Sequence, residues 1–124
     1  MSSTIRFATC AATLLLGACA SFPAPTQRMA DAESAHRAAI EVGAATEPAA
    51  ELHVKLAEEQ MAQAKIRIND GDNRTADSLL IRSKADSELA LALAREHGAK
   101  VDTQRAVDTS KTTAATNSAE GAVK

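Results

Sequence analysis

The sequence predicts an all-α fold: an antiparallel helical hairpin with an additional N-terminal helix, followed by a disordered tail. Three observations carry this prediction. Apolar residues recur at alternating steps of four and three over two long segments, which is the spacing of one helical face. A polar Asn-Asp-Gly-Asp-Asn run at residues 69–73 separates these segments and is typical of a tight turn. The apolar period is lost beyond Val101.

The first predicted helix begins at Thr26, which is a suitable N-cap, and ends near Val42, where Gly43 supplies the stop. Its apolar positions form only a weak stripe, made of Met29, Ala32, Ala35 or Ala39, and Ile40. We therefore expect a helix here, while the sequence leaves open whether this helix packs on the hairpin.

The second predicted helix opens at Thr46-Glu47-Pro48. Threonine can cap a helix, glutamate suits its positive N-terminal dipole, and proline is tolerated in the first turn. Apolar residues then recur with the spacing of a coiled-coil-like seam at Ala50, Val54, Ala57, Met61, Ala64 and Ile68. Leu52 and Leu56 flank this seam on a second face.

The third predicted helix runs from about Arg74 or Thr75 to His97, with Gly98 as its C-cap. Its seam consists of Ala76, Leu80, Ser83, Ser87, Leu91 and Ala94. Three further leucines point away from the seam, and a helix that is apolar on several sides is usually covered on more than one of them. The first predicted helix or a second subunit could cover it. We predict an interaction face, for a protein partner or a second copy, at Leu79, Leu89 and Leu93.

The segments outside the helices differ from them in composition. Thr, Ser, Ala, Asn, Asp and Lys dominate after Val101, which predicts a disordered tail. Pro23 and Pro25 predict a short, stiff tether before the first helix. The expected division is a signal peptide at 1–18, a lipidated cysteine and tether at 19–25, a helical domain at 26–100 and the tail at 101–124.

The N-terminal segment has the plan of an export signal. Arg6 is its one charge, and the apolar stretch that follows is shorter than the about 20 residues of a membrane span. Residues 16–19 read Leu-Gly-Ala-Cys, which resembles the lipobox of bacterial lipoproteins. The motif predicts cleavage between Ala18 and Cys19 and the attachment of acyl chains, palmitate among them, to Cys19.

Several acyl chains on one residue would hold the chain at a membrane almost permanently. Ala20 follows the cysteine, where an aspartate usually marks retention at the inner membrane. By resemblance, this favours the periplasmic face of the outer membrane of a Gram-negative bacterium. An ordinary secretory signal with a chance cysteine is the alternative.

Composition and charge argue against several classes of function. The 124 residues have a formal net charge of −2 and an aromatic content of 2%, so we expect no nucleic-acid interface. Cys10 would leave with the signal and Cys19 would carry lipid, which leaves no thiol for a disulfide, a metal or catalysis. No nucleophile, acid-base pair or phosphate loop has a recognisable pattern. We expect no enzyme, no cofactor and no metal site.

Three sets of polar residues could suggest chemistry, and each has a simpler interpretation. The histidines fall one on each predicted helix without ligand spacing, which is typical of surface or boundary positions. The acidic turn lacks the twelve-residue ladder of a calcium loop, and the glutamates share a solvated face with lysines and glutamines. These sets are His36, His53 and His97; Asp70, Asp72 and Asn73; and Glu51, Glu58 and Glu59.

The chain resembles the DUF4398-type family of small bacterial envelope lipoproteins, a domain of unknown function. The resemblance covers roughly residues 26–95 and rests on the lipobox, the proline-containing tether and the alanine-rich hairpin. The matching residues are Pro48, Leu52, Leu56, Ala64, Gly71, Asp72, Ala76, Leu80 and the alanine-rich stretch through Ala94. The resemblance implies a helical fold and an envelope location, and it implies no reaction.

Together these observations predict a lipid-anchored protein that faces the periplasm and acts as a helical structural or protein-interaction module. The alternative is a small-ligand or peptidoglycan-associated carrier or adaptor. Lys124 offers an amine for attachment to peptidoglycan, as in the major lipoprotein of enteric bacteria. The basic and aromatic residues that precede the lysine there are missing here, so chance is the simpler explanation for Lys124.

Overall fold

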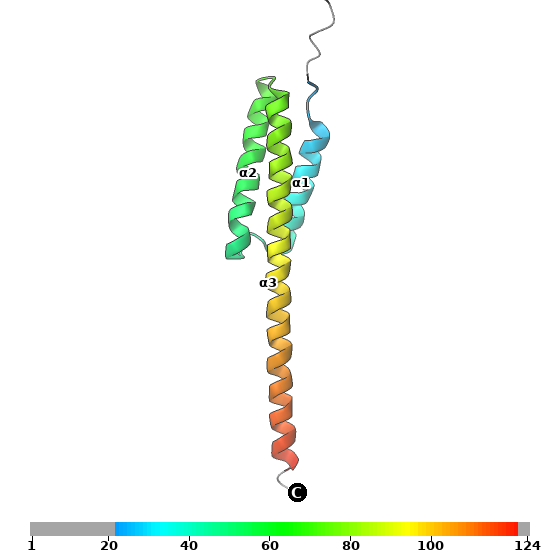
Figure 1. Ribbon diagram of the computed structural model, residues 1–124, viewed down its shortest axis with the longest axis vertical. Helices are drawn as coiled ribbons and strands as arrows, with labels where there is room; N and C mark the ends of the chain where they lie inside the picture. Colours follow the sequence, from blue (N-terminus) through cyan, green and yellow to red (C-terminus); the bar gives the residue numbers. More distant parts are fainter. Residues whose placement is uncertain (1–21, 122–124) are drawn as a thin grey trace, which may run out of the picture.

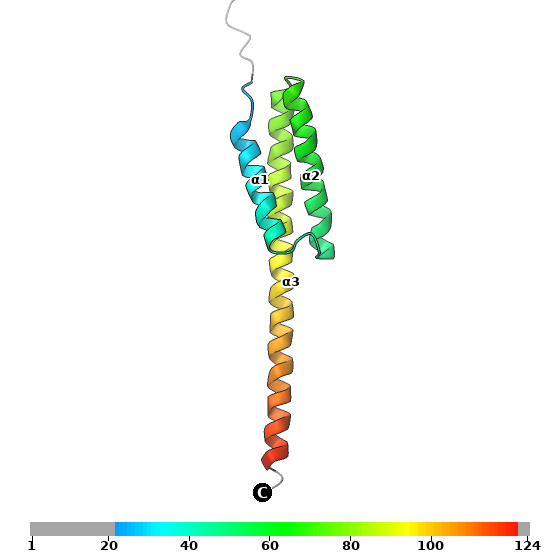
Figure 2. The same cartoon turned by 180° about the vertical axis from the view of Figure 1, so that it is seen from behind.

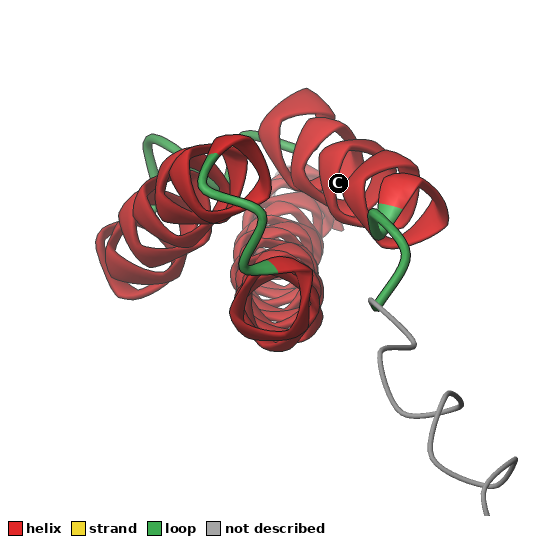
Figure 3. Cartoon of the chain, turned by 90° about the horizontal axis from the view of Figure 1, so that it is seen from above, coloured by secondary structure: helices red, strands yellow, loops and turns green. Residues whose placement is uncertain are grey.

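The computed structural model describes residues 22–121 and contains three α-helices. These are α1 (Thr26–Glu41), α2 (Pro48–Asn69) and α3 (Asn73–Gly121). Helices α1 and α2 both pack on the N-terminal half of α3, and the rest of α3 extends beyond the bundle (Figures 1 and 2). Seen along the bundle, the three helices form a triangle (Figure 3). The predicted all-α hairpin with an additional N-terminal helix is confirmed, and α1 does pack on the hairpin.

The ends of α1 and α2 lie close to the predicted positions, but different residues cap them. Thr26 is the first residue of α1, and Pro25 occupies the N-cap without a side-chain hydrogen bond. Gly43 follows the end of α1 with a φ of 86°, a conformation that favours glycine. Before α2, the Glu47 carboxylate rather than Thr46 accepts the backbone N–H of Ala50, at 2.6 Å.

The α2–α3 turn follows the predicted chemistry. Gly71 has a φ of 80°, which an L side chain rarely adopts. The Asp72 carboxylate accepts the backbone N–H of Thr75 at 3.2 Å and so caps the start of α3. Hydrogen bonds from the side chain and backbone of Thr75 lower the pKa of Asp72 from its ordinary value of 3.8. The turn is therefore held by the conformational freedom of one residue and the side chain of the next.

Small side chains dominate the core, and the predicted seams are largely the buried positions. The buried apolar residues are Ala32, Ala39, Ala44, Ala50, Val54, Ala57, Met61, Ala64, Ala76, Leu80, Ala90 and Ala94. Ile68 and Leu91 are only partly buried, and Ala90 takes the core position next to Leu91. Ser83 and Ser87 are fully buried, with their hydroxyls donating to the carbonyls of Ala57 (2.8 Å) and Ser83 (2.9 Å). Because these side chains are short, α2 and α3 can approach closely.

The predicted end of the third helix is wrong. Helix α3 does not stop at His97: Gly98 is an interior helical residue, and the helix continues to Gly121. Residues 101–121 are therefore helical rather than disordered. We call residues 98–121 the free half of α3, and residues 98–119 are exposed on every side.

Local interactions explain why the helix continues. Extending a helix that is already nucleated costs far less than starting one, and residues 98–121 contain no proline. Glu96 pairs with Lys100 across Gly98 at 2.6 Å, and Asp102 pairs with Arg105 at 2.8 Å. Several hydroxyls, such as that of Thr103, donate to the carbonyl four residues earlier. These contacts are local and bury no apolar surface. A composition with few apolar residues therefore suggested disorder.

The predicted signal cleavage at Ala18 and Cys19, the acylation of Cys19 and the attachment at Lys124 lie outside the described residues.

Candidate interaction surface

The three leucines of the predicted interaction face do not share one environment. Leu89 is 43% exposed. Leu79 is partly buried against the core cluster of Ala32, Met61, Ala64, Ala76 and Leu80. Leu93 is partly buried against the second cluster, formed by Ala39, Ala44, Ala50, Val54, Ala90 and Ala94. Leu79 and Leu93 are thus partly covered within the bundle, and Leu89 is the member of the set that remains exposed. The interaction face itself stays a prediction.

Leu79 and Leu93 are partly covered because α2 lies over this side of α3. Leu79 and Leu93 are each seven residues from Asp86, so all three occupy the same heptad position of the helix. The Asp86 carboxylate is bonded to two residues of α2: His53 Nδ1 lies 2.9 Å from Oδ1, and Gln60 Nε2 donates to Oδ2 at 2.8 Å. These partly buried polar groups fix the register of the hairpin between the two leucines. The sequence held no signal for this coverage, because a lone aspartate on a helix face is typical of an exposed position.

Other large apolar side chains are exposed on the bundle. Leu52 and Ile66 of α2 are 60% and 58% exposed, and they are fourteen residues apart, which places them on one side of the helix. On α3, Ile81 is 46% exposed. Ile66 and Ile81 were not predicted as surface residues of interest, although both lie off the seams that the spacing identified.

One side of α3 carries an exposed apolar side chain in the bundle and another in the free half, with the Glu96–Lys100 pair between them. Leu89 and Val107 are 18 residues apart, which corresponds to five turns at 3.6 residues per turn, so both lie on the same side of α3. Val107 is 41% exposed, comparable to Leu89. A shallow groove follows α3 from Val101 to Thr113, and its lining residues all belong to this one helix. The groove therefore lacks an opposing wall within residues 22–121.

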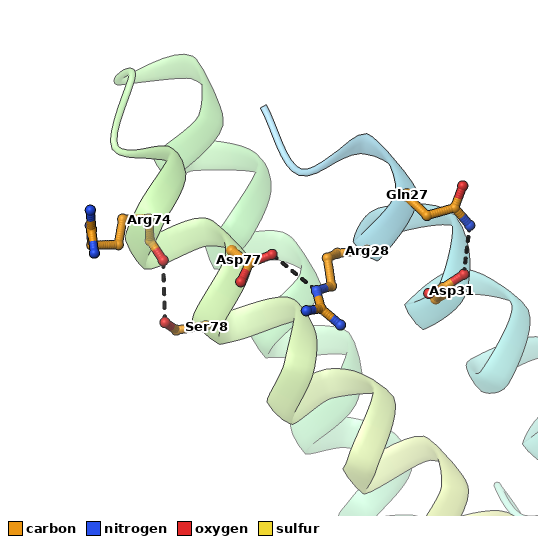
Figure 4. Close-up of polar contacts among 6 residues, drawn as sticks. All are labelled: Gln27, Arg28, Asp31, Arg74, Asp77 and Ser78. Atoms are coloured by element: carbon orange, nitrogen blue, oxygen red, sulfur yellow. Dashed lines mark hydrogen bonds and ion pairs between the residues drawn. The ribbon is translucent and has the colours of Figure 1, made fainter. Parts of the chain in front are cut away.

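Ion pairs attach α1 to the hairpin. Arg28 Nε lies 3.1 Å from the Asp77 carboxylate of α3, and Gln27–Asp31 and Arg74–Ser78 bonds support the same end of the bundle (Figure 4). Toward α2, Glu33 pairs with Lys65 at 3.3 Å, and His36 lies 3.2 Å from Glu58. Each exposed pair contributes little to stability. Their common effect is to fix which side of α1 faces α2 and α3.

The polar sets singled out in the sequence are dispersed. His36 and His53 contact carboxylates, while His97 is exposed near the point where α3 leaves the bundle. Glu51 pairs with Lys55 and Glu59 accepts from Gln63, both on the surface of α2. Among residues 22–121, no three His, Cys, Asp or Glu side chains gather as a metal site would require.

Phe22, just before α1, contacts the first residues of α3. Asn73 Nδ2 donates to the Phe22 carbonyl at 2.8 Å, and the Arg74 guanidinium lies 5.5 Å from the centre of the Phe22 ring. Pro25 is buried. We call residues 22–25 with these contacts the pinned tether. The two prolines predict a tether here, but a contact between residues 51 positions apart leaves no signal in the sequence.

The hollows where α1 meets α3 are partly charged. Two of them have volumes of about 260 and 340 Å³, and Asp31, Lys84 and Glu88 contribute to the walls of both. Ligand pockets usually measure about 300–1,000 Å³ and are mainly apolar. The two hollows therefore lie at the lower end of this range in volume and differ from it in their charged walls.

A family profile described as a domain of unknown function (DUF4398) matches residues 27–106. The chain belongs to the DUF4398 family. The DUF4398 match spans the bundle and the first turns of the free half of α3, so the extension of α3 beyond Gly98 begins inside the family's domain. Neither a curated protein nor a solved structure matches the chain.

None of the three DUF4398 helices in residues 22–121 combines the length and apolar character that crossing a membrane would require.

Proposed function

We propose that this DUF4398 protein is a lipid-anchored protein of the outer membrane of a Gram-negative bacterium, with its helices in the periplasm. In this proposal it acts as a helical interaction module and catalyses no reaction. The anchoring rests on the Leu-Gly-Ala-Cys motif at residues 16–19. The acyl chains are on Cys19, the leader ends at Ala18, and no cofactor or nucleic acid takes part.

The observation that carries the interaction role is the free half of α3. An isolated helix shorter than about 12–15 residues is marginal in water even when it is rich in alanine, and a longer one with many threonines gains little intrinsic stability. Residues 98–119 are nevertheless helical with all sides exposed. A protein partner or a second copy that covers the side of α3 with Leu89 and Val107 would supply the packing that this helix lacks.

Intact mass tests the anchor. Protein extracted from cell membranes with detergent should begin at Cys19 and carry about three acyl chains, as expected for stable anchoring. The Cys19→Ser variant should lack this added mass and should leave the membrane fraction. Wild-type protein without acyl chains would overturn the anchored part of the proposal.

Added charge on this side of α3 tests the interaction. The double variant Leu89→Glu and Val107→Glu should abolish self-association in sedimentation, or abolish the crosslinked species seen in intact cells, while helicity stays unchanged. Both positions are exposed, so the bundle should fold. A matched control adds the same charges at exposed positions of α1, Ala30→Glu and Ser34→Glu. If association survives the Leu89 and Val107 substitutions but is lost with the α1 substitutions, the interface lies on α1 instead.

A further inference from the structure

We infer that the bundle stands with its α2–α3 turn against the lipid surface and directs the free half of α3 away from that surface. This inference rests on the proposed lipid anchor at Cys19. It adds the orientation of the molecule and identifies the end that contacts lipid. The pinned tether and the direction of α3 carry the argument.

The pinned tether fixes the distance between the anchor and the bundle. Phe22 is held to the first residues of α3 by the Asn73 hydrogen bond and by Arg74 over its ring. Only three Cα–Cα steps of 3.8 Å separate Phe22 from Cys19, so the chain can span about 11 Å at most. A lipid on Cys19 therefore keeps Phe22 within about 11 Å of the membrane surface, and the start of α3 lies one side-chain contact beyond Phe22.

The described part of the chain has its tether and its C-terminus at opposite ends. The tether and the α2–α3 turn lie together at one end of the bundle, and α3 runs from there to the far end (Figures 1 and 2). Helix α3 has 49 residues, which corresponds to a length of about 70 Å at a rise of 1.5 Å per residue. In an upright bundle, the free half of α3 therefore lies far from the lipid surface.

Two arginines at the end that faces the lipid lie near carboxylates. Arg28 is paired with Asp77, and Arg67 lies near Asp72 and contributes to its lowered pKa. Phe22 is 40% exposed and apolar, and it is the described residue nearest in sequence to the anchor. The short connection to Cys19 therefore holds this end of the bundle near the lipid surface.

Energy transfer to the lipid surface tests this orientation. The full chain is expressed with one added cysteine, Asp70→Cys at the turn or Thr116→Cys in the free half. Cys10 leaves with the signal and Cys19 is acylated, so the added thiol is the one that takes a donor dye. Purified protein is reconstituted into phosphatidylethanolamine–phosphatidylglycerol vesicles that carry an acceptor dye on the headgroup, and vesicle binding is checked by flotation.

Transfer should be several-fold more efficient from position 70 than from position 116. Equal transfer from the two positions in protein that floats would overturn the orientation and leave the anchor intact. Protein that fails to float would overturn both. Combining Phe22→Ala with Asn73→Ala should release the tether and bring the two efficiencies closer together. Gln27→Ala, an exposed position of α1 outside the pinned tether, is the matched control and should preserve the difference.

Discussion

Gly98 fits two structural roles, the C-cap of a helix and an interior helical position. In the sequence it follows the last periodic apolar residues and fits the C-cap of a helix, yet it lies within α3. The glycines that do adopt positive φ are Gly43 and Gly71. An ideal Cβ at Gly98 would meet no atom within 4 Å, so a side chain fits there. Gly98 therefore costs helix stability without supplying a turn.

Replacing Gly98 with alanine should stabilise α3. Glycine inside a helix is about 0.5–1 kcal/mol less favourable than alanine. Gly98→Ala should therefore increase helical circular dichroism and delay the fraying of the free half on heating. Gly71→Ala is the opposite case, because its φ of 80° disfavours a side chain even though the space is open. A stabilising effect of both variants would contradict this assignment of the two glycines.

At the scale of the element, α3 has two halves with different sources of stability. From Ala76 to Ala94 it has core positions packed against α1 and α2. From Gly98 onward it depends on local pairs such as Glu96–Lys100, in which each partner shifts the pKa of the other toward the charged form. Such exposed pairs are screened by salt and contribute little.

Hydrogen exchange should separate the two halves. Amides between Leu80 and Ala94 should exchange through opening of the bundle, whereas those from Val101 to Ala119 should exchange much faster through local fraying. Mass spectrometry of exchanged peptides measures this directly. Comparable protection in both halves of the isolated protein would mean that a contact covers the free half, and self-association should then be sought at the same concentration.

The elements that could be predicted from the sequence are those set by local patterns. The seams around Val54 and Leu80 follow from spacing alone, and the turn at Gly71 follows from residue type. The end of α3 was missed because a glycine inside a helix and a glycine after one look alike without their neighbours in space. The partial coverage of Leu79 and Leu93 was missed because α2 lies over this side of α3, and the apolar spacing of α3 alone does not show which helix covers it. The pinned tether depends on a contact between distant residues, which no local pattern contains.

At the scale of the whole molecule, the bundle relies on few large side chains. Leu80 is 1% exposed and is the largest apolar side chain that is fully buried. Leu80→Ala should lower the free energy of unfolding by about 2–4 kcal/mol, because it removes a buried isopropyl group and leaves a cavity. Leu52→Ala, at a position that is 60% exposed, should change it by about 0.5 kcal/mol or less. Urea titrations followed by circular dichroism measure both, and equal losses would mean that Leu52 is covered in solution.

The alanine-rich core also has a thermal consequence. Alanine loses no rotamer freedom when it is buried, and it removes little apolar surface from water. The heat capacity change of unfolding grows with the apolar surface that becomes exposed, so it should be small for a core of this kind. A small heat capacity change flattens the dependence of stability on temperature. The bundle should therefore keep a modest but nearly constant margin of stability over a wide range of growth temperatures.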